Sequence, residues 1–321
     1  IWIGKMLKPI RHMFPPLVTG IVVLMIGISL LKVGFKYAGG GVWLMNNKPE
    51  IFANWHHLTI AGTVLIVALL TNLKGRGMVS AASILIGIIA GFIVAAMLGE
   101  VRWEKIAAAG WFALPMPLQY GIDFVWGAVI LMLFMSIVTT IETIGDISAT
   151  TMGGDNREAT NKELSGGIMA DGVGTAFASI FNAMPNTSYS QNAGLVAFTG
   201  VISRHVGTVA GVMLILLGLF PKLGGIIAAM PDSVIGGAAI IMFGLIAGAG
   251  IKLISKSEMN QRNILILSLS LSFGIGLYAF PEFVAHVPDL GIKLGLLLTT
   301  GLIPAGLLAF ILNAILPKKN K

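Results

Sequence analysis

Residues 124–150 have the sequence FVWGAVILMLFMSIVTTIETIGDISAT. This stretch is long and apolar enough to cross a bilayer as a helix, which takes about 20 predominantly apolar residues. Two carboxylates, Glu142 and Asp146, interrupt it four residues apart, and this spacing puts both side chains on one helix face. Ionisable groups at membrane depth are costly, so they usually face a bundle interior or a wet cavity and serve a function. We therefore expect a solute to bind on that face.

The composition of the whole chain indicates the same class of protein. Of its 321 residues, 56% are hydrophobic and 11% are charged, and the mean hydropathy is +0.89. These values predict an all-α polytopic membrane protein. The chain has no cysteine, which excludes disulfides, thiolate catalysis and cysteine-ligated metals. The net charge of +7 does not indicate nucleic-acid binding, because the basic residues of membrane proteins collect in cytoplasmic loops.

Hydropathy and loop residues divide the chain into ten apolar segments. The segment after Gln191 has only about a dozen apolar positions, too few to cross a bilayer, and we expect a half helix there. The segments are predicted at residues 17–35, 56–73, 78–99, 124–150, 164–183, 191–202, 205–228, 233–254, 263–280 and 293–316.

The basic residues predict the orientation of a multi-pass protein in the cell membrane. With the C-terminus in the cytoplasm, most basic loop residues fall on the cytoplasmic side, as the positive-inside rule requires. That side receives Lys5, Lys8, Arg11, Lys74, Arg76, Arg157, Lys162, Arg204, Lys252, Lys256, Arg262, Lys318, Lys319 and Lys321. The opposite side receives only Lys36, Lys48, Arg102, Lys105, Lys222 and Lys293.

A polar stretch precedes the predicted half helix. Residues 182–194 have the sequence NAMPNTSYSQNAG, which contains Pro185 and lies between apolar runs. Such a backbone has to be buried in protein or line a cavity, since lipid cannot satisfy its polar groups. A broken span of this kind is typical of transporter binding sites, where the N-terminus of a half helix directs free N–H groups at the solute.

Residues 191–200, QNAGLVAFTG, resemble the signature of the nucleobase-ascorbate transporters, also called the nucleobase:cation symporter-2 family. The match is specific at Gln191, Asn192, Gly194 and Thr199, and we count Gly200 and Arg204 with the signature. The run from Glu142 to Asp146 resembles the substrate-site span of the family, and Asp171 falls at the carboxylate of its following span. Three motifs in the family's order make coincidence a poor explanation.

This resemblance implies two inverted repeats of seven spans, arranged as a core domain and a gate domain, with a short extended segment before the half helix. The first segment of the chain is similar to the family's fifth span, and residue 1 is Ile. We therefore expect a fragment without the first three to four spans. The expected parts are a cytoplasmic loop and the end of a core span at 1–16, the gate domain at 17–99 and 231–316, the core domain at 100–230, and a basic cytoplasmic tail at 317–321.

The resemblance also implies a function, the import of xanthine or uric acid with protons by an elevator-type motion, with no metal or other cofactor. Glu142 would anchor ring N–H groups by charge-assisted hydrogen bonds, and Gln191 would pair with a neighbouring carbonyl and N–H. Asn192 and a free N–H near Gly194 would contact the ring or brace the half helix. Asp146 and Asp171 are the candidates for proton coupling. A homodimer through the gate domain is expected as well.

Other interpretations stay open at this point. A uracil permease of the same family is one, although such relatives tend to have His at the position of Asp146. An anion carrier of the sulfate-transporter type is another, but it would not need Glu142 facing the solute. Asp171 has an alternative role as a hydrogen-bond link between helices, and Thr199 as a packing residue. An intramembrane enzyme is not indicated, because the sequence shows no Ser-His, Cys-His or metal-ligand arrangement.

Overall fold

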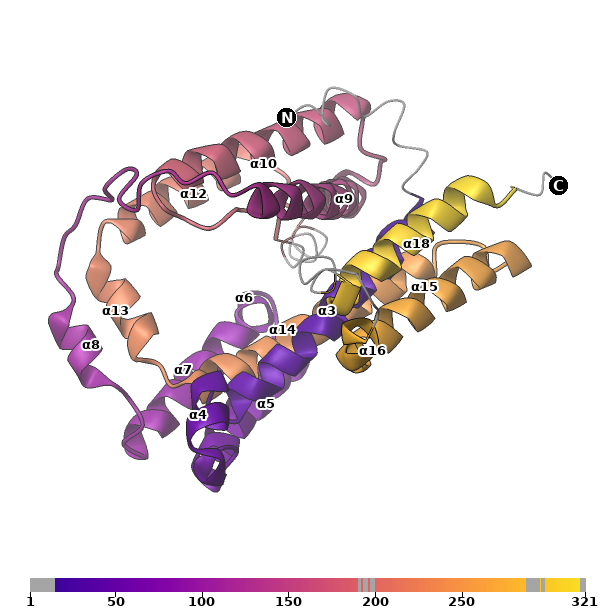
Figure 1. Ribbon diagram of the computed structural model, residues 1–321. Helices are drawn as coiled ribbons and strands as arrows, with labels where there is room; N and C mark the ends of the chain where they lie inside the picture. Colours follow the sequence, from indigo (N-terminus) through magenta and orange to yellow (C-terminus); the bar gives the residue numbers. More distant parts are fainter. Residues whose placement is uncertain are drawn as a thin grey trace. The chain divides into compact units, whose positions relative to one another are not determined.

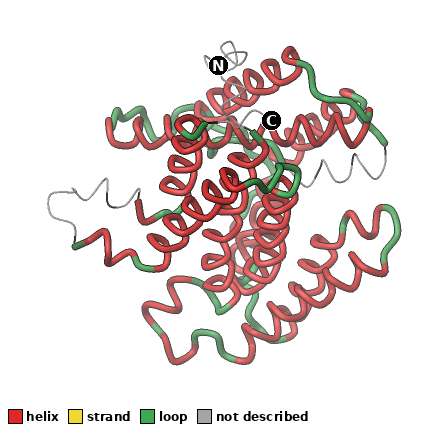
Figure 2. The backbone as a smooth tube through the Cα atoms, turned by 90° about the vertical axis from the view of Figure 1, so that its right-hand side faces the viewer, coloured by secondary structure: helices red, strands yellow, loops and turns green. Residues whose placement is uncertain are grey.

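The computed structural model describes residues 15–189, 192, 196, 200–286, 295 and 298–317. In these residues every regular element is a helix (Figure 1), and the connections are loops (Figure 2), so the all-α class is confirmed for the described chain. The elements are α3 (Pro16–Ala38), α4 (Val42–Asn47), η2 (Pro49–Ile51), α5 (Trp55–Lys74), α6 (Met78–Ala81), α7 (Ser83–Met97), α8 (Trp103–Ala108), α9 (Trp126–Asp155), α10 (Asn161–Ile180), α12 (Arg204–Gly218), α13 (Pro221–Ala229), α14 (Asp232–Ile254), α15 (Gln261–Ala279), α16 (Pro281–Ala285) and α18 (Leu302–Ile315).

Polar residues of the loops set where several helices begin and end. The side chain of Asn54 accepts the His57 N–H at 3.0 Å and so caps α5. Thr160 and Glu163 form a capping box at α10, because the Glu163 N–H donates to the Thr160 hydroxyl at 3.3 Å and the Thr160 N–H donates to the Glu163 carboxylate at 2.8 Å. Asn156 ends α9 in the left-handed region, with φ of 52°.

Four described helices are long and apolar enough to cross a membrane, and α12 with α13 makes a fifth if the bent pair counts as one span. The four are α3, α5, α14 and α15. They confirm the predicted spans at 17–35, 56–73, 233–254 and 263–280.

Two predicted spans are interrupted. The prediction of one continuous span at 205–228 is wrong, because α12 and α13 meet at an angle of 81°. Proline at position 221 begins α13 and has no N–H for the preceding turn, and it pushes Phe220 out of the helical region to φ −109° and ψ 86°. The predicted span at 78–99 is divided at Ala82 into α6 and α7.

The described residues form two compact units, of which the first draws on the ranges Ile1–Ser29, Met116–Ile202 and Ile246–Lys321. Its α15 packs along α18 (Figure 1), and both contact the start of α3. The buried residues of this core are Leu17, Val18, Ile21, Leu24, Met25, Ile254, Ile266, Ala305 and Ala309. Glycines allow α3 and α14 to approach closely: a Cβ added at Gly27 would lie 2.5 Å from the backbone N of Ala247.

The second unit consists of Leu30–Pro115 and Ser203–Leu245. Here α5 packs against α7, where Gly87 and Gly91 face Ala68 and Val64. The buried residues of its core are Ile60, Val64, Ala95, Val101, Ala229, Val234 and Ala238. The division of the chain into gate and core domains stays a prediction.

Helices α9 and α10 of the first unit carry two of the three motifs of the predicted site, the run from Glu142 to Asp146 and Asp171. A small apolar cluster joins them, in which Leu164 and Ile168 of α10 are buried against Ile144 and Ile147 of α9. After α10 the chain is irregular from residue 183 to 189, and Pro185 lies within this stretch. Residues 183–189 belong to the longer polar run 182–194 of the sequence. From here on, the polar stretch means residues 183–189 alone.

Candidate functional site

The two carboxylates of α9 both meet the polar stretch. The Thr187 hydroxyl donates to Oε2 of Glu142 at 3.5 Å, and the Ser188 hydroxyl donates to Oδ2 of Asp146 at 2.5 Å. Adjacent hydroxyls of the polar stretch therefore contact carboxylates one helical turn apart. This arrangement follows from the four-residue spacing, which places Glu142 and Asp146 on one face of α9.

Asp171 lies on α10 and connects the two helices. The Thr143 hydroxyl of α9 donates to its Oδ2 at 3.3 Å. Thr143 is buried, with 3% of its surface exposed, whereas Asp171 is half-buried, so the bond is partly protected from water. The contact supports the role of Asp171 as a link between helices, and its role in proton coupling stays a prediction.

The polar stretch is attached to α10 as well. The Thr175 hydroxyl donates to Oδ1 of Asn186 at 2.6 Å. Gly174 makes this approach possible, because a Cβ at that position would lie 2.8 Å from Nδ2 of Asn186. The small residues that follow Asp171 in the sequence thus let the polar stretch lie against the helix.

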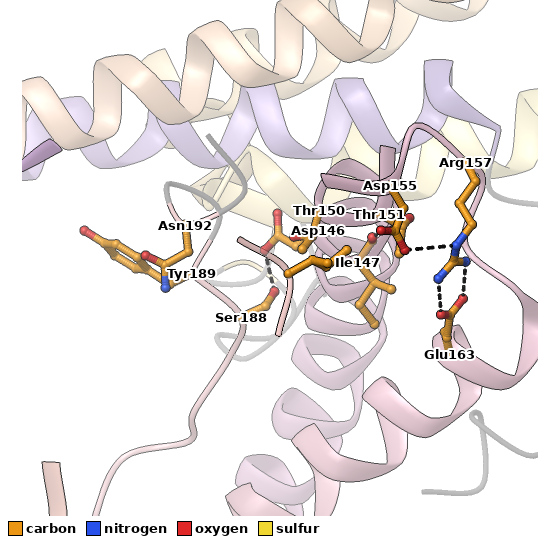
Figure 3. A pocket seen from close by; sticks show the side chains of 11 residues that line it. Asp146, Ile147, Thr150, Thr151, Asp155, Arg157, Glu163, Ser188, Tyr189 and Asn192 are labelled. Carbon is orange, nitrogen blue, oxygen red and sulfur yellow. Dashed lines mark hydrogen bonds and ion pairs between the residues drawn. The ribbon is translucent and has the colours of Figure 1, made fainter. Parts of the chain in front are cut away.

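A pocket of about 430 Å³ lies beside these contacts (Figure 3). Its lining comes from α9, the loop after α9, the first turn of α10, the polar stretch and two further residues: Asp146, Ile147, Thr150, Thr151, Asp155, Arg157, Glu163, Ser188, Tyr189, Asn192 and Ile202. Of the predicted site residues, Asp146 and Asn192 line it. Glu142, the predicted main anchor, does not; its described contact is with Thr187.

An ion-pair cluster occupies another part of the pocket wall. The Arg157 guanidinium donates to both carboxylate oxygens of Glu163, at 2.9 and 2.6 Å, and its Nε donates to Asp155 at 3.2 Å. Figure 3 shows these bonds on the far side of Thr150 and Thr151 from the Asp146–Ser188 pair. The hydrogen bonds from Arg157 hold the pKa of Glu163 well below its ordinary range, and Glu163 raises the pKa of Arg157.

The remaining predicted residues are placed as follows. Gln191, Gly194 and Thr199 lie outside the described residues. Gly200 has φ of 68°, a conformation that suits glycine, and a Cβ there would meet nothing within 4 Å. Arg204 is the first residue of α12 and is exposed. Within the described ranges, no group of three or more His, Cys, Asp or Glu side chains could hold a metal ion.

Reasoning from the sequence did not single out several residues of the site. Thr187 and Ser188 were visible only as part of a polar run, and nothing in the sequence shows which carboxylate each hydroxyl meets. The pattern Thr160-x-x-Glu163 is a capping-box signal that predicts the start of α10. It does not predict the bidentate pair between Glu163 and Arg157, because that contact depends on the path of the loop.

Comparison with known proteins identifies the family of the chain. Its residues 1–283 match the model of the Permease family, Xan_ur_permease. The chain belongs to this permease family. The permease is therefore a multi-pass membrane transporter and not an enzyme, and the resemblance seen in the signature residues is confirmed.

Named relatives support the same assignment. The permease is 35% identical to xanthine permease XanP of Escherichia coli strain K12, over 99% of this chain and 69% of XanP. It is 36% identical to xanthine permease XanQ of the same strain, over 96% of this chain and 66% of XanQ. It is 34% identical to uric acid permease PucJ of Bacillus subtilis strain 168, over 96% of this chain and 68% of PucJ. The chain thus spans about two thirds of the length of these relatives.

Proposed function

We propose that the permease imports a purine nucleobase, xanthine or uric acid, together with protons. The observation that carries the proposal is the pair of carboxylates one turn apart on α9, each bonded to a hydroxyl of the polar stretch, with Asp146 lining a pocket of about 430 Å³. Relatives that share about a third of the residues are named xanthine and uric acid permeases, which supports the same substrate class.

The chemistry of the site suits such a solute. A purine with oxo groups presents ring N–H donors and carbonyl acceptors along a rigid edge. Carboxylates accept two such N–H groups, and Asn192 and Ser188 in the pocket offer both donors and acceptors. The pocket volume lies in the range of about 300–1,000 Å³ typical of small-molecule sites.

We assign recognition of the ring to Glu142 and Gln191. Glu142 lies one helical turn from the pocket residue Asp146 and meets the polar stretch through Thr187. Gln191 lies outside the described residues.

We assign proton coupling to Asp146. Its partner Ser188 is a hydroxyl, which can donate to the ionised carboxylate or accept from the protonated carboxyl group. The pair therefore stays hydrogen-bonded in both protonation states, so a proton can bind and leave without exposing an unpaired polar group. Asp171 is a second candidate. Transport then follows an elevator-type motion in which the core carries the site past the gate.

The test is uptake of radiolabelled xanthine by cells that express the permease gene, with uric acid and uracil as competitors. We expect uric acid to compete better than uracil, a protonophore to abolish uptake, and Glu142→Gln to lose it. Glu104→Gln, an exposed carboxylate of α8, is the matched control and should transport normally.

Other results would overturn parts of the proposal. If uracil competes best, the protein is a pyrimidine permease of the same family. Uptake of sulfate in place of purines would favour an anion carrier. Normal xanthine uptake by Glu142→Gln would refute the assignment of the anchor.

A further inference from the structure

The pocket that Asp146 lines also contains the cluster of Asp155, Arg157 and Glu163, which purine recognition does not use. These three residues come from three consecutive parts of the chain. Asp155 is the last residue of α9, Arg157 lies in the following loop, and Glu163 lies in the first turn of α10. We call them the loop cluster.

The loop cluster lies well away from Asp146 along the same helix. Asp155 lies nine positions after Asp146, and at a rise of 1.5 Å per residue this is about 13.5 Å. The side chains of Thr150 and Thr151, which also line the pocket, lie between them (Figure 3). The pocket therefore runs along α9 from the coupling carboxylate to the loop cluster.

The Glu163 carboxylate is hydrogen-bonded to two residues of the loop, Thr160 and Arg157. Its carboxylate accepts the Thr160 N–H and the Thr160 hydroxyl, each at 2.8 Å, and both of its oxygens accept bonds from Arg157. The bond from Arg157 Nε to Asp155 then joins this group to the end of α9. The Arg157 guanidinium thus connects the end of α9, through Asp155, with the first turn of α10, through Glu163.

The ion pairs of the loop cluster are exposed and therefore weak, as a contact that breaks and forms again has to be. The side chains of Arg157, Asp155 and Glu163 have 43%, 39% and 38% of their surface exposed. Ion pairs this accessible to water each shift an equilibrium by only about one- to fivefold, since the solvent screens them and competes for the same hydrogen bonds. They can therefore break without unfolding the helices on either side.

We propose that the loop cluster closes the loop end of the pocket and restricts access to Asp146 while the ion pairs of Arg157 are formed. We also call the loop cluster the gate, which is not to be confused with the expected gate domain. The proposal rests on the proposed function only in taking this pocket as part of the route of the solute. Opening the gate frees the loop between α9 and α10 and widens the path along α9.

The absence of cysteine from the chain allows a direct test. Thr150→Cys places a single thiol in the pocket, and its rate of reaction with a small water-soluble thiol reagent in permeabilised membranes measures access. Ile202→Cys provides a second reporter in the pocket wall if the first variant folds poorly. Labelling needs no transported solute, so its result does not depend on the identity of the substrate.

The gate is opened by Glu163→Gln in the background of each reporter. Glutamine can keep the capping-box bond to the Thr160 N–H, but it cannot form the charged bidentate pair with Arg157. We expect labelling to accelerate by about two- to fivefold, which is the range that the weakness of exposed ion pairs allows. Arg157→Gln removes the ion pairs to both Asp155 and Glu163 and leaves the capping box in place, so it should accelerate labelling at least as much.

Two controls separate the ion pair from other effects. Thr160→Ala removes the capping hydroxyl and leaves Arg157 and Glu163 in place, so labelling should stay slow. Arg102→Gln breaks an exposed pair with Asp232 in the other compact unit and should have no effect. Unchanged labelling in Glu163→Gln, or equal acceleration in Thr160→Ala, would refute the gate. If uracil were the best competitor in the uptake assay, the proposed substrate would be refuted and the gate would be left in place.

Discussion

The close packing of α3 on α14 makes a quantitative prediction about Gly250. A Cβ added there would lie 2.4 Å from the backbone N of Leu24 and 2.6 Å from its Cα. To reach the 3.4 Å at which ordinary contact begins, the backbone of α3 would have to withdraw by about 1.0 Å. Overpacking of this kind costs about 1–3 kcal/mol.

The same helix provides the control. Gly248 lies two residues away on α14, and a Cβ there would meet nothing within 4 Å. Both substitutions to alanine gain about 1 kcal/mol of helix propensity, so this gain cancels in the comparison. Gly250→Ala is therefore expected to be about 1–3 kcal/mol less stable than Gly248→Ala.

The assay is thermal unfolding of each purified variant in detergent, followed by tryptophan fluorescence. Gly250→Ala should melt below the parent protein or close to it, and Gly248→Ala at or above it. Equal melting temperatures of the two variants, or a lower value for Gly248→Ala, would show that α3 and α14 are not packed as described.

Three further predictions concern polar contacts. The pKa of Glu163 is lowered from an ordinary value of 4.5, so the bond to Arg157 stabilises the protein above that pH and is lost as the pH falls through the lowered value. The melting temperature of Glu163→Gln should therefore lie below that of the parent at pH 7, and the difference should shrink on acidification below pH 4.5. Arg262 donates to the backbone carbonyl of Asn313 in α18 at 2.7 Å and to that of Leu316, the C-cap of this helix, at 3.1 Å. Arg262→Gln should therefore destabilise by about 1–3 kcal/mol in denaturant titrations, unlike the exposed control Lys256→Gln. Thr143→Val keeps the shape of the side chain but removes the bond to Asp171, so a loss of about 1 kcal/mol is expected; unchanged stability would contradict the role of Asp171 as a link between helices.

Much of the fold could be predicted because apolar length and capping residues are local signals. The spans near α3, α5, α14 and α15 follow from runs of apolar residues, and the start of α10 follows from Thr160 and Glu163. The bend between α12 and α13 was missed, although Pro221 was visible. The mean hydropathy of residues 205–228 stays high across the bend, so it gives no sign of it. Proline changes the backbone conformation of the one residue before it, here Phe220.

The site divides in a similar way between local and tertiary information. The spacing of Glu142 and Asp146 was sufficient to predict a shared helix face, and the signature residues were sufficient to predict the family. Which hydroxyl meets which carboxylate, and that Asp146 rather than Glu142 lines the pocket, could not be predicted. These contacts depend on how an irregular stretch without a repeating pattern lies against two helices.

The sequence by itself determined the class of this protein, its main spans and its membership of the permease family. Apolar length, helical spacing and signature residues can all be read from the order of the amino acids, without knowledge of tertiary contacts. Only the tertiary structure decided that Asp171 is bonded to Thr143 and that Arg157 ties Glu163 to Asp155 across the end of the pocket. The physical reason is that a side-chain hydrogen bond requires two groups to come within about 3 Å, and the packing of α9, α10 and the loops brings them there.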